Sequence, residues 1–267
     1  MRNFFACRVT TIRGTGEEII MHGRILTFKG YMPKIGFQSR HSTPGAETIL
    51  VEKFIDFYSS RFLRQYSKQN LGLFIEPKLE SGFPDIVFAH YTPSLMKSSW
   101  TEARGELDAN DLKVLSYLIQ TGGSNGRKMI NKLRFSGDLV LYSLEKLLAA
   151  KWVSWKNHYW WPSGLHRNFG LKKLVAIEAK INGVGKATTQ ALANTWFASH
   201  AYALTDAVHP HPATLASLSR LGVGLYCKGN PFHKTLDSRE RSLPSSYASL
   251  LFNEWVAKSV LQWRFAS

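Results

Sequence analysis

The chain has 267 residues, which suggests one large domain or two modest ones. Hydrophobic residues make up 44% and charged residues 20%, which excludes a mainly disordered chain. The sequence also lacks any run of about 18 apolar residues, so no membrane-spanning helix is expected. With 34 Lys and Arg against 19 Asp and Glu, the net charge of +15 favours a polyanionic partner. The only cysteines, Cys7 and Cys227, form neither a disulfide framework nor a zinc site, which favours a reducing, cytoplasmic setting.

Residues 1–42 contain short β-like stretches, such as residues 24–28. No functional role can be read from this segment. The next element is a helix expected over residues 46–60. Its buried face is predicted by apolar side chains that recur at spacings of three and four, namely Leu50, Val51, Phe54, Phe57 and Tyr58. Glu47 shares that side, where a carboxylate is costly unless it is paired or bound to a metal, whereas Glu52 and Asp56 lie on the solvated side.

The rest of this half alternates strands and helices. Strands are expected over residues 71–75 and 85–89, and the most strand-like stretch is residues 171–181. In that stretch Glu178 and Lys180 share one face, because strand side chains repeat every two residues. Further elements are expected as a helix over 186–199, a strand over 200–205, a helix over 212–221 and a strand over 223–227. This order predicts an α/β fold with a mixed sheet covered by helices.

Four charged residues occur in a fixed order along these predicted helices and strands. Glu47 lies on the first helix, Pro84-Asp85 at a strand start, and Glu178-Ala179-Lys180 on the next core strand. The arrangement resembles the PD-(D/E)XK nuclease superfamily, over about residues 43–106 and 171–228. The resemblance implies a restriction-endonuclease-like mixed sheet flanked by helices. It also implies that Glu47, Asp85, Glu178 and Lys180 are catalytic, with Gln190 as a polar residue near the site.

Those residue types suit phosphodiester hydrolysis. A divalent ion such as Mg²⁺ takes oxygen ligands and can supply both a nucleophilic water and charge stabilisation. Asp85 and Glu178 would be its carboxylate ligands, with the Ala179 backbone carbonyl as a third. Lys180 would orient or deprotonate the water and offset developing charge, and Glu47 would bind a second ion or hold a metal-bound water. Mn²⁺ is expected to substitute. The alternative is a Glu178–Lys180 surface ion pair on an edge strand, which the apolar stretch LVAI before Glu178 disfavours.

Asp85 and Glu178 are separated by 178 − 85 = 93 positions, too many for one compact loop, which predicts an inserted domain. We therefore expect a discontinuous nuclease-like domain over residues 1–106 and 171–267 and an insertion over residues 107–162. The insertion reads as a helix ended by Gly122-Gly123, a short helix over residues 125–135, and a third helix over residues 138–150 capped by Ser136. A two-stranded hairpin with a turn at Lys156-Asn157 follows. The segment resembles a winged helix-turn-helix.

A winged helix places its third helix in the major groove and its hairpin near the DNA backbone. The expected DNA-binding residues are Arg127, Lys128, Lys132, Arg134, Tyr142, Lys146 and Lys156. A winged helix that docks a protein partner instead is the alternative reading. Trp152, Trp155, Trp160 and Trp161 are expected mainly to pack rather than to stack on bases.

The sequence therefore predicts a magnesium-dependent DNA endonuclease. Alternatives are a non-catalytic DNA-binding protein with a nuclease-like fold, and the nuclease subunit of a mobile-element or defence complex. His209 and His211 suggest an HNH-type metal site, but the flanking prolines favour a loop. The expected partners are DNA and a second copy of the chain or a larger nucleoprotein complex, without a membrane. An amphipathic helix near the C-terminus would pack on the domain or bind a partner.

Overall fold

The structure is a computed structural model that describes residues 9–14, 17–41, 43–98, 100–181 and 183–266. The chain divides into two compact units. Unit 1 consists of Met1–Tyr91 and Lys172–Leu243, and unit 2 of Thr92–Leu171 and Pro244–Ser267. The segment predicted as an insertion, residues 107–162, lies within unit 2. Unit 2 also takes in residues 92–106 and the C-terminal helix, which the sequence analysis assigned to the nuclease-like half.

Unit 1 is built on one mixed sheet, which confirms the α/β class. Its strands are β1 (Val9–Gly14), β2 (Glu17–His22), β3 (Ile25–Met32), β4 (Phe37–Gln38), β5 (Asn70–Ile75), β6 (Ile86–Tyr91), β9 (Leu171–Lys180), β10 (His200–Thr205), β11 (Gly224–Cys227) and β12 (His233–Leu236). Its helices are α1 (Ala46–Gln65), α8 (Val184–Ala193) and α9 (Pro212–Leu221), with short 3₁₀ turns η1 (Pro33–Ile35) and η2 (Asn194–Trp196).

The strand order is β1-β2-β3-β5-β6-β9-β10-β11-β12, with β4 paired to β3. β9 pairs in parallel with β10, and β10 with β11, whereas β5 and β6 are antiparallel. β9 therefore lies inside the sheet, between β6 and β10, and is not an edge strand. This position explains its continuous apolar run, because both of its faces are covered.

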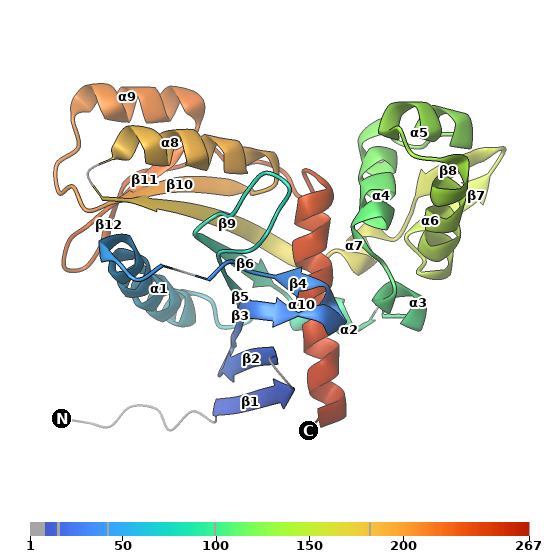
Figure 1. The fold of residues 1–267 in the computed structure, drawn as a ribbon, viewed down its shortest axis with the longest axis horizontal. Coiled ribbons are helices and arrows are strands. Elements are labelled where there is room, and N and C mark those ends of the chain that lie inside the picture. Colours follow the sequence, from blue (N-terminus) through green and yellow to red (C-terminus); the bar gives the residue numbers. More distant parts are fainter. Residues whose placement is uncertain (1–8, 15–16, 42, 99, 182, 267) are drawn as a thin grey trace. The chain divides into compact units, whose positions relative to one another are not determined.

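Helices cover both faces of the sheet (Figure 1). On one face, Leu50 and Phe54 of α1 pack with Val175 and Ile177 of β9. On the other face, α8 and α9 pack with β10 and β11 through a cluster of small and apolar residues: Ala187, Ala191, Ala203, Leu218, Val223, Leu225 and Cys227. The alternation of β9 thus sends Val175 and Ile177 toward α1 and Glu178 toward the face that α8 covers. The predicted apolar stripe of the first helix is confirmed, although α1 continues to Gln65.

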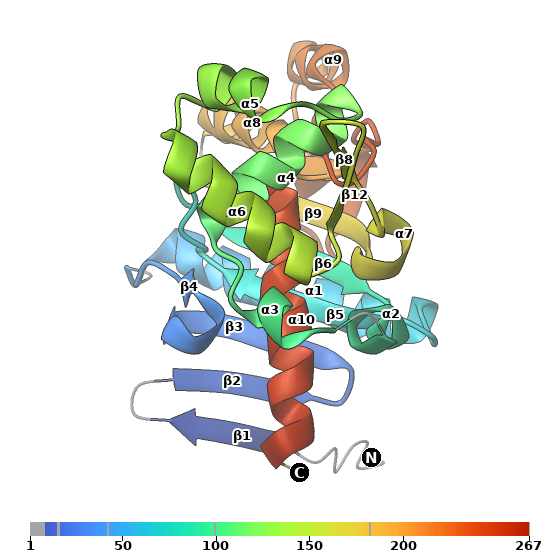
Figure 2. The same ribbon diagram turned by 90° about the vertical axis from the view of Figure 1, so that its right-hand side faces the viewer.

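Unit 2 is mainly helical (Figure 2). Its elements are α2 (Pro93–Ser98), α3 (Glu102–Gly105), α4 (Ala109–Thr121), α5 (Gly126–Leu133), α6 (Gly137–Ala149), β7 (Val153–Lys156), β8 (Tyr159–Pro162), α7 (Leu165–Asn168) and α10 (Tyr247–Ala266). Ser136 caps α6 as predicted, since its hydroxyl accepts the N–H of Leu139 at 3.2 Å. The hairpin turn lies one residue later than predicted, at Asn157 and His158. Both have positive φ, 53° and 62°, as a two-residue hairpin turn of this hand requires.

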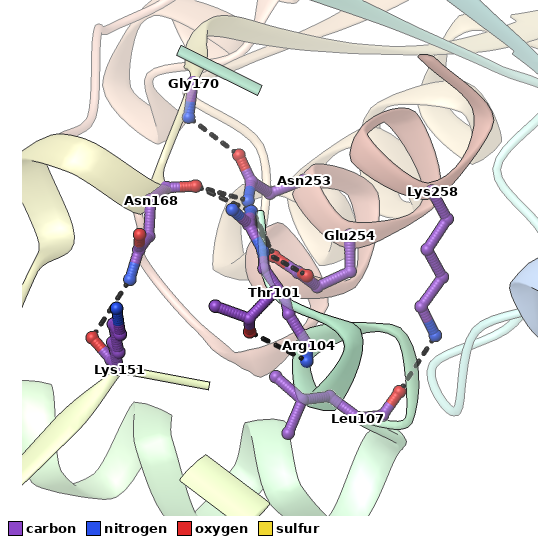
Figure 3. Close-up of polar contacts among 9 residues, drawn as sticks. All are labelled: Thr101, Arg104, Leu107, Lys151, Asn168, Gly170, Asn253, Glu254 and Lys258. Carbon is purple, nitrogen blue, oxygen red and sulfur yellow. Dashed lines mark hydrogen bonds and ion pairs between the residues drawn. The ribbon is translucent and has the colours of Figure 1, made fainter. Parts of the chain in front are cut away.

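A buried ion pair fixes α10 within unit 2 (Figure 3). Arg104 is fully buried, and its Nε and one Nη donate to the two carboxylate oxygens of Glu254 at 2.8 Å each. The same guanidinium donates to the Asn168 carbonyl at 2.7 Å. Asn253 completes the network by accepting the Gly170 N–H at 2.8 Å. These contacts join α3, α7 and α10, which explains why the C-terminal helix belongs to unit 2.

Candidate active site

Asp85 and Glu178 are brought together by two neighbouring strands of the sheet. Asp85 directly precedes β6, and Glu178 lies near the end of β9. The Asp85 Oδ2 accepts the backbone N–H of Ala179 at 2.8 Å, which joins residues 94 positions apart. The Asp85 carbonyl in turn accepts the N–H of Glu76 at 3.0 Å, so both ends of this residue are held. The neighbouring positions of β6 and β9 in the sheet therefore place the two carboxylates at one site.

Burial and mutual repulsion disfavour two negative charges here. Glu178 is 4% exposed. Burial first, and then the nearby Asp85 carboxylate, raise the pKa of Glu178 to about 8. Burial likewise raises the pKa of Asp85, against the opposing effects of the Ala179 N–H and Lys180. The site thus holds a proton on one carboxylate at neutral pH, unless a cation compensates the charge.

Lys180 reaches the helix that begins beside the site. Its Nζ donates to the Glu47 Oε2 at 2.9 Å, from β9 to the first turn of α1. Burial lowers the pKa of Lys180, but the hydrogen bond with Glu47 and the charges of Asp85, Glu47 and Glu178 outweigh it and raise the pKa overall. Lys180 is therefore an ammonium at neutral pH. Glu52 is exposed on α1, as its position on the solvated side predicted.

The polar side chain beside Glu178 is Asn194 rather than Gln190. The Asn194 Nδ2 donates to the Glu178 Oε1 at 2.6 Å, from the turn that follows α8. Gln190 is exposed on α8, and no hydrogen bond joins it to an acidic residue within the described part of the chain. Asn194 lies four residues further along, in the 3₁₀ turn that follows α8. The helix predicted over residues 186–199 therefore ends earlier than expected, at Ala193, and the contact with Glu178 comes from the turn after it.

A second ion pair beside the carboxylates was not predicted. Arg40 Nε donates to Glu76 Oε2, and Glu76 is 8% exposed. The Glu76 charge raises the pKa of Asp85, and the Arg40 charge lowers that of Glu178, so both act on the site electrostatically. Glu76 adopts a positive φ of 45°, which is uncommon for a residue with a side chain and is frequent at functional sites. In the sequence, the dipeptide Glu76-Pro77 is the local pattern that marks this unusual backbone position.

The donor set fits a magnesium-like ion with few protein ligands. Two carboxylates that repel each other in a buried place gain from a divalent cation between them. The Ala179 N–H points to Asp85, and a strand residue directs its N–H and carbonyl to the same side, so the Ala179 carbonyl faces this region too. No cluster of three or more His, Cys, Asp or Glu suited to a metal occurs among the described residues. The fit is therefore to an ion that keeps several waters.

The residues expected to contact DNA lie in unit 2. Arg127, Lys128 and Lys132 are exposed on α5, and Arg134 follows it in the left-handed conformation. Tyr142 on α6 is 60% exposed, and Lys156 is exposed on β7. Lys146 differs from the expectation, because its ammonium already pairs with Asp111 and Asp108 and its side chain is 14% exposed. It stabilises the packing of α6 on α4 rather than offering a free cation.

Comparisons with protein-family models, with curated proteins and with solved structures find no match to this chain. No described helix has the length and apolar character needed to cross a bilayer.

Proposed function

We propose that the protein is a metal-dependent DNA endonuclease of the PD-(D/E)XK type, with a cytoplasmic location. The observation that carries this proposal is the meeting of Asp85, Glu178 and Lys180 across β6 and β9. A site that forces two carboxylates together and raises the pKa of one to about 8 is destabilised without a compensating cation. An ion pair with a purely structural role, between Lys180 and one carboxylate, would not require a second carboxylate buried beside the first.

In this proposal Asp85, Glu178 and the Ala179 carbonyl hold Mg²⁺, for which Mn²⁺ substitutes. The ion would supply a nucleophilic water and stabilise charge on the phosphate. Lys180, already protonated, stabilises the charge that develops on the phosphate oxygens. Glu47 positions the Lys180 ammonium through their 2.9 Å contact. Asn194 orients the Glu178 carboxylate, in the way that outer hydrogen bonds orient metal ligands generally.

The fold is compatible with this proposal. A mixed sheet with α1 on one face and α8 and α9 on the other is the layering that the restriction-endonuclease-like resemblance implies. In unit 2, α4, α5 and α6 followed by the hairpin β7–β8 are the elements of a winged helix-turn-helix. The exposed cations on α5 and β7 would contact DNA phosphates. Cutting both strands with one site per chain would require a second copy.

One observation favours a second role for unit 2. The recognition-helix surface of α6 exposes Leu141 by 54% and Tyr142 by 60%, and Trp155 of the hairpin is 49% exposed. Apolar side chains of this size are typical of protein interfaces. The alternative is therefore a nuclease subunit of a larger complex, in which unit 2 docks a protein partner. A non-catalytic DNA-binding protein is the remaining alternative.

The decisive experiment is incubation of the protein with supercoiled and linear plasmid, with Mg²⁺, Mn²⁺ or EDTA, read on a gel. We expect cleavage with either metal and none with EDTA. Asp85→Asn should abolish cleavage and leave DNA binding intact. It keeps an oxygen that can accept the Ala179 N–H, so no backbone donor is left unpaired. Glu52→Gln, an exposed carboxylate on α1, is the matched control. Metal-independent cleavage, or an active Asp85→Asn protein, would refute the proposal.

A further inference from the structure

A cavity of about 130 Å³ lies in unit 1 between the second half of α1 and the sheet. Its walls come from α1, from His90 on β6, and from Lys173 on β9, Tyr202 on β10, Tyr226 on β11 and Lys234 on β12. Lys173 and Glu178 are five residues apart on β9, about 17 Å in a strand, and point to opposite faces. The cavity is therefore separate from the candidate active site.

The charged residues that line this cavity are all basic. They are Arg61, Lys173 and Lys234, and no carboxylate lines the cavity within the described ranges. Lys173 is half-buried, and burial together with the Lys234 charge lowers its pKa. Lys234 pairs with Asp237, which is exposed, and the exposed Glu240 is the other acid that acts on Lys173. The charges of Lys173 and Lys234 therefore repel each other, and the acids that act on them, Asp237 and Glu240, do not line the cavity.

Two tyrosines also line the cavity. Tyr202 and Tyr226 are 3% and 7% exposed as whole residues, and each contributes to the cavity wall. Burial raises the pKa of Tyr226, so its hydroxyl stays protonated and can donate. His90 is neutral because burial lowers its pKa to about 3, and its Nε2 lies 2.9 Å from the Tyr58 hydroxyl. The cavity thus offers cations and hydroxyl donors, which is the complement of an oxyanion.

We propose that this cavity binds a phosphate group. The size supports a single group rather than a whole nucleotide, because a cavity of roughly 150 Å³ holds one benzene ring. Phosphate has several acceptor oxygens and would bridge Lys173 and Lys234 while accepting from Tyr202 and Tyr226. Arg61 and Gln65 are exposed at the rim, so the rest of a larger molecule can extend outward there. The phosphate could belong to a nucleic-acid strand end or to a free nucleotide, which share this chemistry.

The test is calorimetric titration of the full chain with inorganic phosphate, in EDTA and at constant ionic strength. Lys173→Met should weaken phosphate binding at least about tenfold, since a charge-assisted hydrogen bond is lost. Lys172→Met removes the same charge from the adjacent, exposed position and should change the affinity less than about twofold. Tyr226→Phe, which loses only the hydroxyl, should also weaken binding. Equal loss in both lysine variants, or no saturable binding to the wild type, would overturn the proposal.

Two further arms separate the sources and the sites. A short oligonucleotide with a 5′-phosphate is compared with its 5′-hydroxyl form and with a nucleoside monophosphate. The proposal is supported if either phosphate compound binds more tightly than the 5′-hydroxyl form and if Lys173→Met abolishes that difference. Asp85→Asn should bind phosphate as the wild type does, so the outcome is independent of whether the protein cleaves DNA. Lys173→Met removes a half-buried charge and should not melt below the wild type, which distinguishes lost binding from unfolding.

Discussion

Lys180 and Glu47 are 133 positions apart in the sequence, yet the Lys180 Nζ lies 2.9 Å from the Glu47 Oε2. This contact joins the end of β9 to the first turn of α1. It explains how a carboxylate is tolerated on the apolar side of that helix, because it is paired and remains half exposed. It also keeps Lys180 protonated, so we assign Lys180 to charge stabilisation rather than to deprotonating the water.

Lys180→Ala should lower the single-turnover cleavage rate by roughly 100-fold or more, because a charge aimed at the developing phosphate charge is lost. Lys180→Arg should recover part of that rate. Lys186→Ala, an exposed lysine on α8, is the control and should cleave normally. A Lys180→Ala protein as fast as the wild type would contradict the assignment.

Without metal, the protein should become less stable as the pH rises from about 5 to 8.5. The pKa of Glu178 is raised from its ordinary 4.5 to about 8 in the folded state, so the folded protein holds a proton that the unfolded chain has released. The free energy of unfolding therefore falls with pH through this window. Glu178→Gln cannot titrate, and its melting temperature should exceed that of the wild type at the alkaline end and match it near pH 5. Parallel melting curves in EDTA would show that Glu178 is not perturbed.

Asn194→Ala should weaken magnesium binding by about 10–100-fold, as loss of an outer hydrogen bond to a metal ligand does elsewhere. The Asn194 amide lowers the pKa of Glu178, so its removal should also shift the rising limb of the pH–rate profile to higher pH. Gln190→Ala is the matched control, since this amide lies four residues earlier, on α8, and is exposed. If Gln190→Ala shifts the profile and Asn194→Ala does not, the assignment of the amide is wrong.

Replacing Lys128 and Lys132 with alanine should reduce the salt dependence of DNA binding. Each phosphate contact contributes about 0.9 to the slope of log affinity against log salt, so the slope should become shallower by roughly two. Both lysines are exposed on α5, so the fold should be preserved. Binding titrations at several salt concentrations measure the slope. An unchanged slope would favour the protein-docking role for unit 2.

Glu254→Gln should destabilise unit 2 by about 3–5 kcal/mol, because it leaves the buried Arg104 guanidinium without its counter-charge. Seven of the eight tryptophans lie in the ranges of unit 2, all except Trp196, so tryptophan fluorescence during urea unfolding reports on this unit. Glu145→Gln, at an exposed position of α6, should change stability by less than about 0.5 kcal/mol. Similar midpoints for the two variants would contradict the expected cost.

The sequence predicted the bounds of a helix or strand best where residues that start and stop such elements stand at both of its ends. The helix over residues 212–221 begins at Pro212 and ends before Gly222, and the structure gives the same bounds. The family resemblance also implied that Asp85 and Glu178 share a site. The contacts of Asn194, Arg40 and Glu76 were missed because they depend on how distant segments approach, which no local pattern contains. The membership of α10 in unit 2 was missed for the same reason, since an amphipathic face does not identify its partner.

The position of β9 between β6 and β10 has a consequence for biosynthesis. β6 ends at Tyr91 and its neighbour β9 begins at Leu171, with most of unit 2 between them. At a translation rate of about 5–20 residues per second, β6 waits roughly 4–16 s for that neighbour. During this time a strand that is buried in the finished protein has an open edge, which makes the nascent chain a candidate for chaperone binding. An unfinished chain that stops before β9 carries Glu47 and Asp85 but neither Glu178 nor Lys180, so it cannot assemble the acidic site while still on the ribosome.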